Sequence, residues 1–203
     1  DVTEKDSIRG SLLGPSYSNS EIRNFLDQQK VSYTHFEKEE ELLRVTAQEI
    51  AAGQVVGWFH GHMEFGPRAL GSRSIIGDAR SDEMQCQMNM RIKFRESFRP
   101  FAPSVLAEDA GKYFDLDRES PYMLIVADLK KEHWNELTEE QKKLMKHSDL
   151  RKRVNVSKSS LPAITHVDMS ARVQTVDESR HGRYYRLIDE FKRQTGCGVV
   201  INT

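Results

Sequence analysis

The sequence lacks most of the features that would place it in a specialised structural class. Its 203 residues include two cysteines, Cys86 and Cys197, which are far apart and match neither a disulfide scaffold nor the paired spacing of a zinc site. No apolar run approaches the roughly 18 residues that span a bilayer. The first residues carry neither the basic nor the apolar segment of a secretory signal. We therefore expect reduced thiols, a cytoplasmic location and no membrane contact.

The sequence also lacks an excess of charge of either sign. The 30 lysines and arginines stand against 31 aspartates and glutamates, which excludes an overall basic surface for nucleic acid or anionic lipid. The glycine-rich signatures GxxxxGKS, GxxxxGKT and GxGxxG are absent, so the common nucleotide-binding folds are not indicated. With 37% hydrophobic residues, the chain can still build a core for one large domain or two small ones.

Both ends of the sequence suggest a fragment. The chain does not begin with methionine, and it stops at Thr203 directly after an apolar run over residues 198–201 that predicts a buried strand. We expect residues 1–20, which contain glycine, proline and several serines, to form a linker or arm from an absent N-terminal domain. Residues 21–203 would then form one domain that is truncated at its C-terminus.

Helical and strand patterns are mixed without regular alternation, which favours an α/β fold of the α+β kind with a mixed sheet. Caps and periodicity predict helices that begin at Ser20, Thr46 and Ser81 or that cover residues 107–113, 138–147 and 183–195. Strands are predicted over residues 55–59, 91–95, 122–127, 163–167, 171–176 and 198–201. Residues 61–77 are predicted to be a loop, and the highly charged residues 130–160 a surface excursion.

Positive charge is concentrated between residues 61 and 104. If residues 91–95 form a strand, one face carries Arg91, Lys93 and Arg95 while the other face packs on the core. Arginine offers planar bidentate donors to phosphate or carboxylate, and lysine offers a point charge. The segment therefore predicts a polyanion site, for a nucleoside triphosphate or an acyl phosphate.

Two flanking features support an anion site at this segment. A glycine-rich loop contributes Arg68 and Arg73 together with backbone N–H groups that can approach an anion closely. Pro100 and Pro103 fix the backbone just after the segment, which suits a pocket wall more than a surface strand. The alternative is a solvated surface strand whose cations pair with nearby acids, namely Glu64, Asp78, Asp82 and Glu83.

The histidines are weaker candidates. His60 and His62 stand two residues apart, but no third ligand follows at a recognisable spacing, so we predict no metal site. His166 and Asp168 are predicted to share one face of a strand, where they could hydrogen-bond a ligand or pack at the strand end. A hydrolase triad is not indicated, because no nucleophile elbow is present.

Longer motifs carry a family resemblance. GHMEFGPRALGSRSIIGD at residues 61–78, IKFRESFRPFAPS at residues 92–104 and THVDMSARVQTV at residues 165–176 resemble the signature of NodU-type carbamoyltransferases. The resemblance spans nearly the whole chain except residues 130–160. It implies the C-terminal domain of a two-domain enzyme, with a YrdC-like fold in which helices pack around a twisted, largely mixed sheet.

The resemblance also implies an activity. Such a C-terminal domain is expected to use carbamoyl phosphate, ATP and Mg²⁺ to make a carbamoyl-adenylate. An actin-like N-terminal domain, with its own metal, would then transfer the carbamoyl group to a hydroxyl acceptor, so the fragment alone should not complete the transfer. The expected partners are small-molecule substrates and that N-terminal domain, with no nucleic acid and no membrane, and a homodimer is left open.

Motif positions assign roles to individual residues. The resemblance gives Lys93 and Arg99 catalytic roles. It gives substrate- or nucleotide-binding roles to Arg68, Arg73, Ser74, Arg95, His166, Arg172 and Asn202. The sequence departs from the family where His60 and His62 replace the usual Gln and Arg. Where the family has Arg, His62 carries no permanent charge, and this loss would alter phosphate affinity.

Two alternatives stay open. One is another YrdC-type activity, which makes threonylcarbamoyl-adenylate or a carbamoyl-adenylate for hydrogenase maturation, although the GPRALGSRS run at residues 66–74 favours the NodU type. The other is a non-catalytic RNA-binding module on a concave cationic sheet, whose affinity should weaken steeply with salt.

Overall fold

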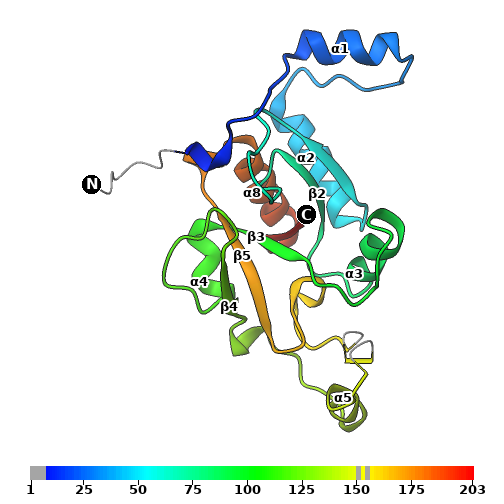
Figure 1. Cartoon of the computed structure of the whole chain (residues 1–203), viewed down its shortest axis with the longest axis vertical. Coiled ribbons are helices and arrows are strands. Elements are labelled where there is room, and N and C mark those ends of the chain that lie inside the picture. The colour runs from blue at the N-terminus through cyan, green and yellow to red at the C-terminus, as the bar shows by residue number, and fades with distance from the viewer. Residues whose placement is uncertain (1–7, 150–151, 154–155) are drawn as a thin grey trace.

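A single mixed β-sheet forms the frame of the computed structural model, which describes residues 8–149, 152–153 and 156–203 (Figure 1). The strands are β1 (Val56–Phe59), β2 (Arg73–Asp78), β3 (Ala102–Leu106), β4 (Ile125–Asp128), β5 (Ser170–Val176) and β6 (Val199–Asn202). Their order across the sheet is β1-β2-β6-β3-β5-β4. β3 and β5 run parallel, and the other neighbours run antiparallel. The predicted α/β class with a mixed sheet is confirmed.

At one end of the strands, segments that are far apart in the sequence come together. Asn202 of β6 pairs with Ile76 of β2 on one side and with Ala102 of β3 on the other. Because of these directions, β2, β3 and β5 begin at the end of the sheet where β1, β4 and β6 terminate. The loop that leads into β2, the segment that leads into β3 and the turn that leads into β5 therefore meet there.

The described part of the chain also contains helices. They are α1 (Asn19–Gln28), α2 (Glu39–Ala51), α3 (Met84–Gln87), α4 (Ala110–Tyr113), α5 (Glu139–Met145), α7 (Glu178–His181) and α8 (Arg183–Thr195). Short 3₁₀ turns lie at Arg9–Ser11, Ala107–Asp109, Lys131–His133 and Pro162–Ile164. α2 and α8 pack against each other, and α8 also contacts β3 and β6. None of the helices in the described ranges is long and apolar enough to cross a membrane.

α1 stands apart from the rest of the molecule (Figure 1). It contains no buried residue, and Phe25 on this helix is 61% exposed. The segment that precedes α1 is bound to the loop before β2: Gly14 N–H donates to Met63 O and Met63 N–H donates to Pro15 O, both at 2.9 Å. Residues 8–36 thus form an arm that is anchored at one point and extends a helix outward.

Several predicted elements are confirmed. α8 covers residues 183–195 as predicted, buries its stripe at Tyr184, Leu187, Ile188 and Phe191, and ends at Gly196 in the left-handed conformation with φ +77°. α5 lies within the predicted helix over 138–147 and begins at a capping box on Thr138. The predicted strands over 55–59, 171–176 and 198–201 correspond to β1, β5 and β6.

Other predictions about local structure are wrong. α2 begins at Glu39, and Thr46 lies inside it, donating its hydroxyl to Leu42 O at 2.7 Å instead of capping a helix start. The predicted loop over 61–77 contains the start of β2, and Pro162–Ile164 is a 3₁₀ turn where a strand was predicted.

Candidate functional site

The segment before β3 wraps around one buried side chain, Asn89. The Asn89 amide donates to the backbone oxygens of Ser97 at 3.1 Å and Arg99 at 2.8 Å. Its Oδ1 accepts from Arg95 Nε at 2.6 Å. Since Asn89 is fully buried, these bonds fix the shape of residues 95–99 from inside.

The backbone beside Asn89 is helical where a strand was predicted. In the π-helical turn Met88–Ile92, the N–H of Lys93 donates to Met88 O, five residues earlier, at 2.9 Å. The strand predicted over residues 91–95 is therefore wrong.

The cations of this segment consequently do not share one strand face. Ile92 and Phe94, which a strand would have packed on the core, are 40% and 85% exposed, and Phe94 adopts a left-handed φ of +49°. A strand would carry the partners of Asn89 out of reach, and an unpaired buried amide costs about 1–3 kcal/mol. Alternation of side-chain type does not report that requirement.

The three cations nearest β3 differ in what they contact. Arg95 is held by Asn89 and lies over the ring of Phe101 at 4.9 Å. Arg99 forms an ion pair with Glu96 at 2.9 Å, and both side chains are more than half exposed, so this pair is weak. Lys93 is half-buried and forms no hydrogen bond or ion pair from its side chain with any described residue. Its burial and the nearby charge of Arg95 lower the pKa of Lys93.

A buried carboxylate organises the glycine-rich loop. Glu64 Oε1 accepts from the backbone N–H groups of Leu70 at 2.8 Å and Ser72 at 2.6 Å, and from that of Arg73 at 3.3 Å. Glu64 is 7% exposed, so it is not the surface partner that the salt-bridge alternative required. The sequence analysis missed this role. A lone acid in a loop whose backbone needs hydrogen-bond acceptors is the signal that could have found it.

Two of the predicted binding residues are engaged in holding this loop. The Arg73 guanidinium donates to carbonyl oxygens of His60, Ser72, Pro15 and Gly61 at 2.9–3.2 Å and lies 3.6 Å from the centre of the Phe59 ring. Ser74 is buried, and its Oγ accepts from Gly71 N–H at 3.0 Å. Both side chains shape the loop through contacts with the chain itself.

Arg68 and Arg172 form a pair of like charges. Arg172 projects from β5, is half-buried, and has a buried Nε without a hydrogen-bond partner. Burial and the nearby charge of Arg68 lower the pKa of Arg172. Neither arginine has an ion pair with the described residues. Adjacent cations without an acid are an arrangement that a bound anion would stabilise.

Asn202 belongs to a buried polar network. Its Nδ2 donates to Gln174 Oε1 at 2.8 Å and to Ala69 O at 3.1 Å. Gln174 also accepts from Ser104 Oγ at 2.6 Å and donates to Leu70 O at 2.8 Å, so three strands are tied to the loop above them. The Oδ1 of Asn202 is buried and forms no hydrogen bond with the described residues, which is unusual for a polar atom in a folded protein. The sequence analysis missed Ser104 and Gln174, whose types are unremarkable for strands.

His166 lies on the turn into β5, not on a strand. Its backbone oxygen accepts from Met169 N–H at 3.0 Å, and Met169 adopts a left-handed φ of +68°. Burial lowers the pKa of His166, against the opposing charge of Asp168. Asp168 Oδ1 accepts from both the N–H and the hydroxyl of Ser170, so the predicted shared strand face is wrong although the two residues are neighbours.

The strand directions bring the predicted residues to one end of the sheet. Among these residues the side chains of Arg68, Lys93 and Arg172 have neither an ion pair nor a hydrogen bond within the described part of the chain. The acids proposed as partners in the surface-strand alternative do not pair with the cations at positions 91–99 in the described structure; Asp78, for example, binds Arg80 at 2.7 Å. The arrangement fits a ligand with several anionic oxygens.

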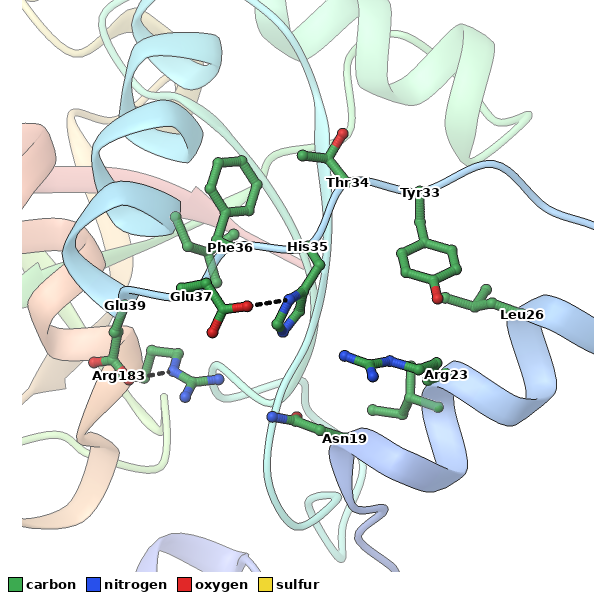
Figure 2. A pocket seen from close by; sticks show the side chains of 12 residues that line it. Asn19, Arg23, Leu26, Tyr33, Thr34, His35, Phe36, Glu37, Glu39 and Arg183 are labelled. Carbon is green, nitrogen blue, oxygen red and sulfur yellow. Dashed lines mark hydrogen bonds and ion pairs between the residues drawn. The ribbon is translucent and has the colours of Figure 1, made fainter.

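A groove of about 400 Å³ lies between α1 and the segment that leads into α2 (Figure 2). Figure 2 shows Asn19, Arg23 and Leu26 of α1 on one side and the segment from Tyr33 to Glu37 on the other, with Arg183 bound to Glu39 at the base. None of the predicted site residues lines this groove.

Comparison with known proteins gives consistent matches. A family model described as carbamoyltransferase C-terminus matches residues 47–203. An uncharacterised protein of Synechocystis sp. is 53% identical over the whole chain, which corresponds to 32% of that protein. Nodulation protein NolO of Bradyrhizobium diazoefficiens is 34% identical over 94% of the chain and 31% of its own length. The 3'-hydroxymethylcephem-O-carbamoyltransferase of Streptomyces clavuligerus is 37% identical over 76% of the chain and 24% of its own length. The chain spans a third or less of these relatives.

Proposed function

The chain belongs to the carbamoyltransferase C-terminus family, and from this premise we propose that it activates carbamoyl phosphate within an O-carbamoyltransferase. The observation that carries the proposal is that Arg68, Lys93 and Arg172 have no ion pair among the described residues and come from segments that meet at the end of the sheet where Asn202 lies. The name of the Streptomyces relative supports a hydroxyl group as the class of acceptor.

The proposed product is a carbamoyl-adenylate. ATP contributes its adenylate, and pyrophosphate leaves when the bond between the α- and β-phosphates breaks. Because the product carries one phosphate, which comes from ATP, water must also release the phosphate of carbamoyl phosphate as inorganic phosphate. A carbamate oxygen then forms the new bond to the α-phosphorus. Both released groups are anions, so the site has to stabilise negative charge throughout.

The chain's own residues meet that requirement by electrostatics. Arg68 and Arg172 would contact phosphate oxygens through their planar donors, and Lys93 and Arg99 would stabilise the charge on the departing pyrophosphate. The exposed pair between Arg99 and Glu96 contributes little stability, so Arg99 can exchange it for a phosphate. The Oδ1 of Asn202 can accept an N–H group of the bound substrates.

Mg²⁺ is expected to enter with the phosphates of ATP. This ion prefers carboxylate and phosphate oxygens, and it often takes only one or two ligands from the protein. Asp168, on the turn into β5, is a carboxylate at this end of the sheet that fits such a role. When bound, the ion would neutralise part of the phosphate charge.

The acceptor step is proposed to take place on another domain. We place it on an actin-like N-terminal domain with its own metal, and the chain's share of about a third of its relatives leaves room for such a domain. The groove of Figure 2 and the unburied apolar side chains of α1 would face it.

ATP–pyrophosphate exchange, measured on the full-length enzyme with carbamoyl phosphate, tests the activation step. We expect Lys93→Ala and Arg99→Ala to lower the exchange rate by about a hundredfold each, the scale of losing one charge-stabilising donor. Arg91→Ala is the matched control, because Arg91 is exposed on the same segment and the motif assigns it no role. It should leave exchange unchanged.

Full exchange in both Lys93→Ala and Arg99→Ala would show that the site assignment is wrong. Exchange driven by threonine and bicarbonate in place of carbamoyl phosphate would instead favour the threonylcarbamoyl-adenylate alternative. RNA binding that persists at about 150 mM salt would favour the binding-module alternative.

A further inference from the structure

A second cavity, outside the site described above, lies under α5. It has a volume of about 310 Å³ and is bounded by residues of the excursion between β4 and β5 and by the turn into β5. Its lining combines apolar side chains, Trp134, Leu137, Met145 and Met169, with three lysines, Lys142, Lys146 and Lys158. This size and this mixture of apolar surface with a few charged groups are typical of small-molecule sites.

The wall of the cavity is fixed by hydrogen bonds. Asn135 donates its amide to the backbone oxygens of Ser157 and Ser159, both at 3.1 Å, and its N–H to Lys158 O at 2.9 Å. Trp134 Nε1 donates to Leu129 O at 2.9 Å, which orients the indole. The two ends of the excursion are therefore clamped together, and the cavity between them is preformed.

Lys158 is the unusual member of the lining. It is 3% exposed, yet its ammonium forms no hydrogen bond or ion pair with any described residue. Burial lowers the pKa of Lys158, and the charge of Asp168 opposes this effect. Asp168 is itself held by Ser170, at 2.7 Å from its hydroxyl. A largely buried charge without an ion pair is costly, and proteins keep one mainly where something else neutralises it.

The other two lysines of the lining, Lys142 and Lys146, are not largely buried charges without a partner. Lys142 forms an ion pair with Glu139 at 2.7 Å, so its charge is already balanced. Lys146 is exposed at the rim and has no ion pair with the described residues. Among the residues that the structure describes, no acidic side chain lines the cavity. The charge that the cavity lacks is therefore negative.

We infer that this cavity binds a small organic anion, with a carboxylate against Lys158 and an apolar, aromatic-sized body among Trp134, Leu137 and Met169. A cation is disfavoured by the three lysines, and a neutral apolar molecule would leave Lys158 unpaired. The cavity shares no lining residue with the nucleotide site proposed above, but it adjoins that site, because Met169 lies on the turn that also carries His166 and the charge of Lys158 acts on His166.

Calorimetric titration with 1-naphthoate and its neutral analogue 1-naphthamide tests the inference on the 203-residue chain. We expect 1-naphthoate to bind about tenfold more tightly, because a hydrogen bond to a charged group contributes about 1.5–3 kcal/mol. Equal affinity for the two compounds, or no binding of 1-naphthoate, would overturn the inference without any variant.

Two variants locate the binding. Lys158→Met keeps the length of the side chain and should abolish the preference for the anion, while Lys142→Met, the matched control, should keep it. Lys158→Met removes a buried unpaired charge, so its melting temperature should not fall. A preference that survives in Lys158→Met, or a preference that is lost in Lys142→Met instead, would place the anion elsewhere and contradict the inference.

Discussion

At the scale of single residues, the shape of the proposed nucleotide site depends on buried polar side chains that carry no positive charge. Asn89 holds the segment before β3, and Glu64 holds the loop before β2. Arg68 lies in the loop that Glu64 holds, and Lys93 lies in the segment that Asn89 holds. Their positions therefore depend on hydrogen bonds made several residues away.

Asn89→Leu tests this dependence. The branching and the number of heavy atoms are the same, but the oxygens of Ser97 and Arg99 lose their donor and Arg95 loses its acceptor, so we expect the free energy of unfolding to fall by about 2–3 kcal/mol. Urea denaturation measures the change. Gln87→Leu is the control, because the Gln87 amide bonds only the exposed Glu83 at 3.2 Å and should change stability little. Equal effects of the two substitutions would contradict the role given to Asn89.

The same residues show what the sequence could predict at this scale. Motif position identified Arg68, Lys93 and Arg172, which the structure leaves without ion pairs among the described residues. It could not tell them from Arg73, because the bonds of Arg73 go to backbone carbonyls of distant residues. Periodicity likewise could not show that residues 88–92 form a π-helical turn, in which Asn89 holds the following segment, and not the start of a strand.

At the scale of elements, one carboxylate joins two parts of the fold. Asp109, in the 3₁₀ turn before α4, is 1% exposed and pairs with Lys112 of α4 at 2.5 Å and with Lys192 of α8 at 2.6 Å. Burial alone would raise the pKa of Asp109, but the hydrogen bonds from the two lysines outweigh it and lower the pKa. The carboxylate is thus more acidic folded than unfolded.

Asp109→Asn should therefore destabilise the chain in a pH-dependent way. At pH 7 we expect a loss of about 2 kcal/mol in the free energy of unfolding. Because the folded pKa lies below the unfolded one, this contribution is complete above about pH 4 and is lost as the pH falls through the folded pKa. Melting temperatures of parent and variant should accordingly converge at low pH.

The control for this substitution is Asp117→Asn, which breaks an exposed pair with Arg118. It should leave the melting temperature unchanged at every pH. A constant difference between Asp109→Asn and the parent from pH 7 down to pH 3 would refute the ion-pair explanation.

Helices with clear caps were predictable, and β2 was not. α8 and α5 carry their own signals, namely a four-residue apolar stripe with a terminal glycine and a capping box on Thr138. β2 contains Gly77, which reads as a loop residue. A Cβ there would lie 3.0 Å from the sulfur atoms of Met84 and Met88, so glycine is required by packing from another element.

At the scale of the whole molecule, the sheet is less tolerant at its centre than at its edge. Val200→Asp on β6, where the side chain is fully buried, should abolish cooperative thermal unfolding, because an unpaired charge would enter the core. Val126→Asp on the edge strand β4 makes the same change at a side chain that is 59% exposed, and it should keep the transition. Circular dichroism during heating distinguishes them. Similar melting curves would refute the central role of β6.

The position of β6 also bears on how this part of the protein is made on the ribosome. β6 lies between β2 and β3, although it comes after every other strand in the sequence. Until Asn202 has emerged, the pair β1–β2 and the group β3–β5–β4 have no strand to join them. Each then offers an unpaired edge that favours association with other chains. The sheet should consequently close only after β6 has left the ribosome, and chaperones that cover strand edges would be needed most just before that moment.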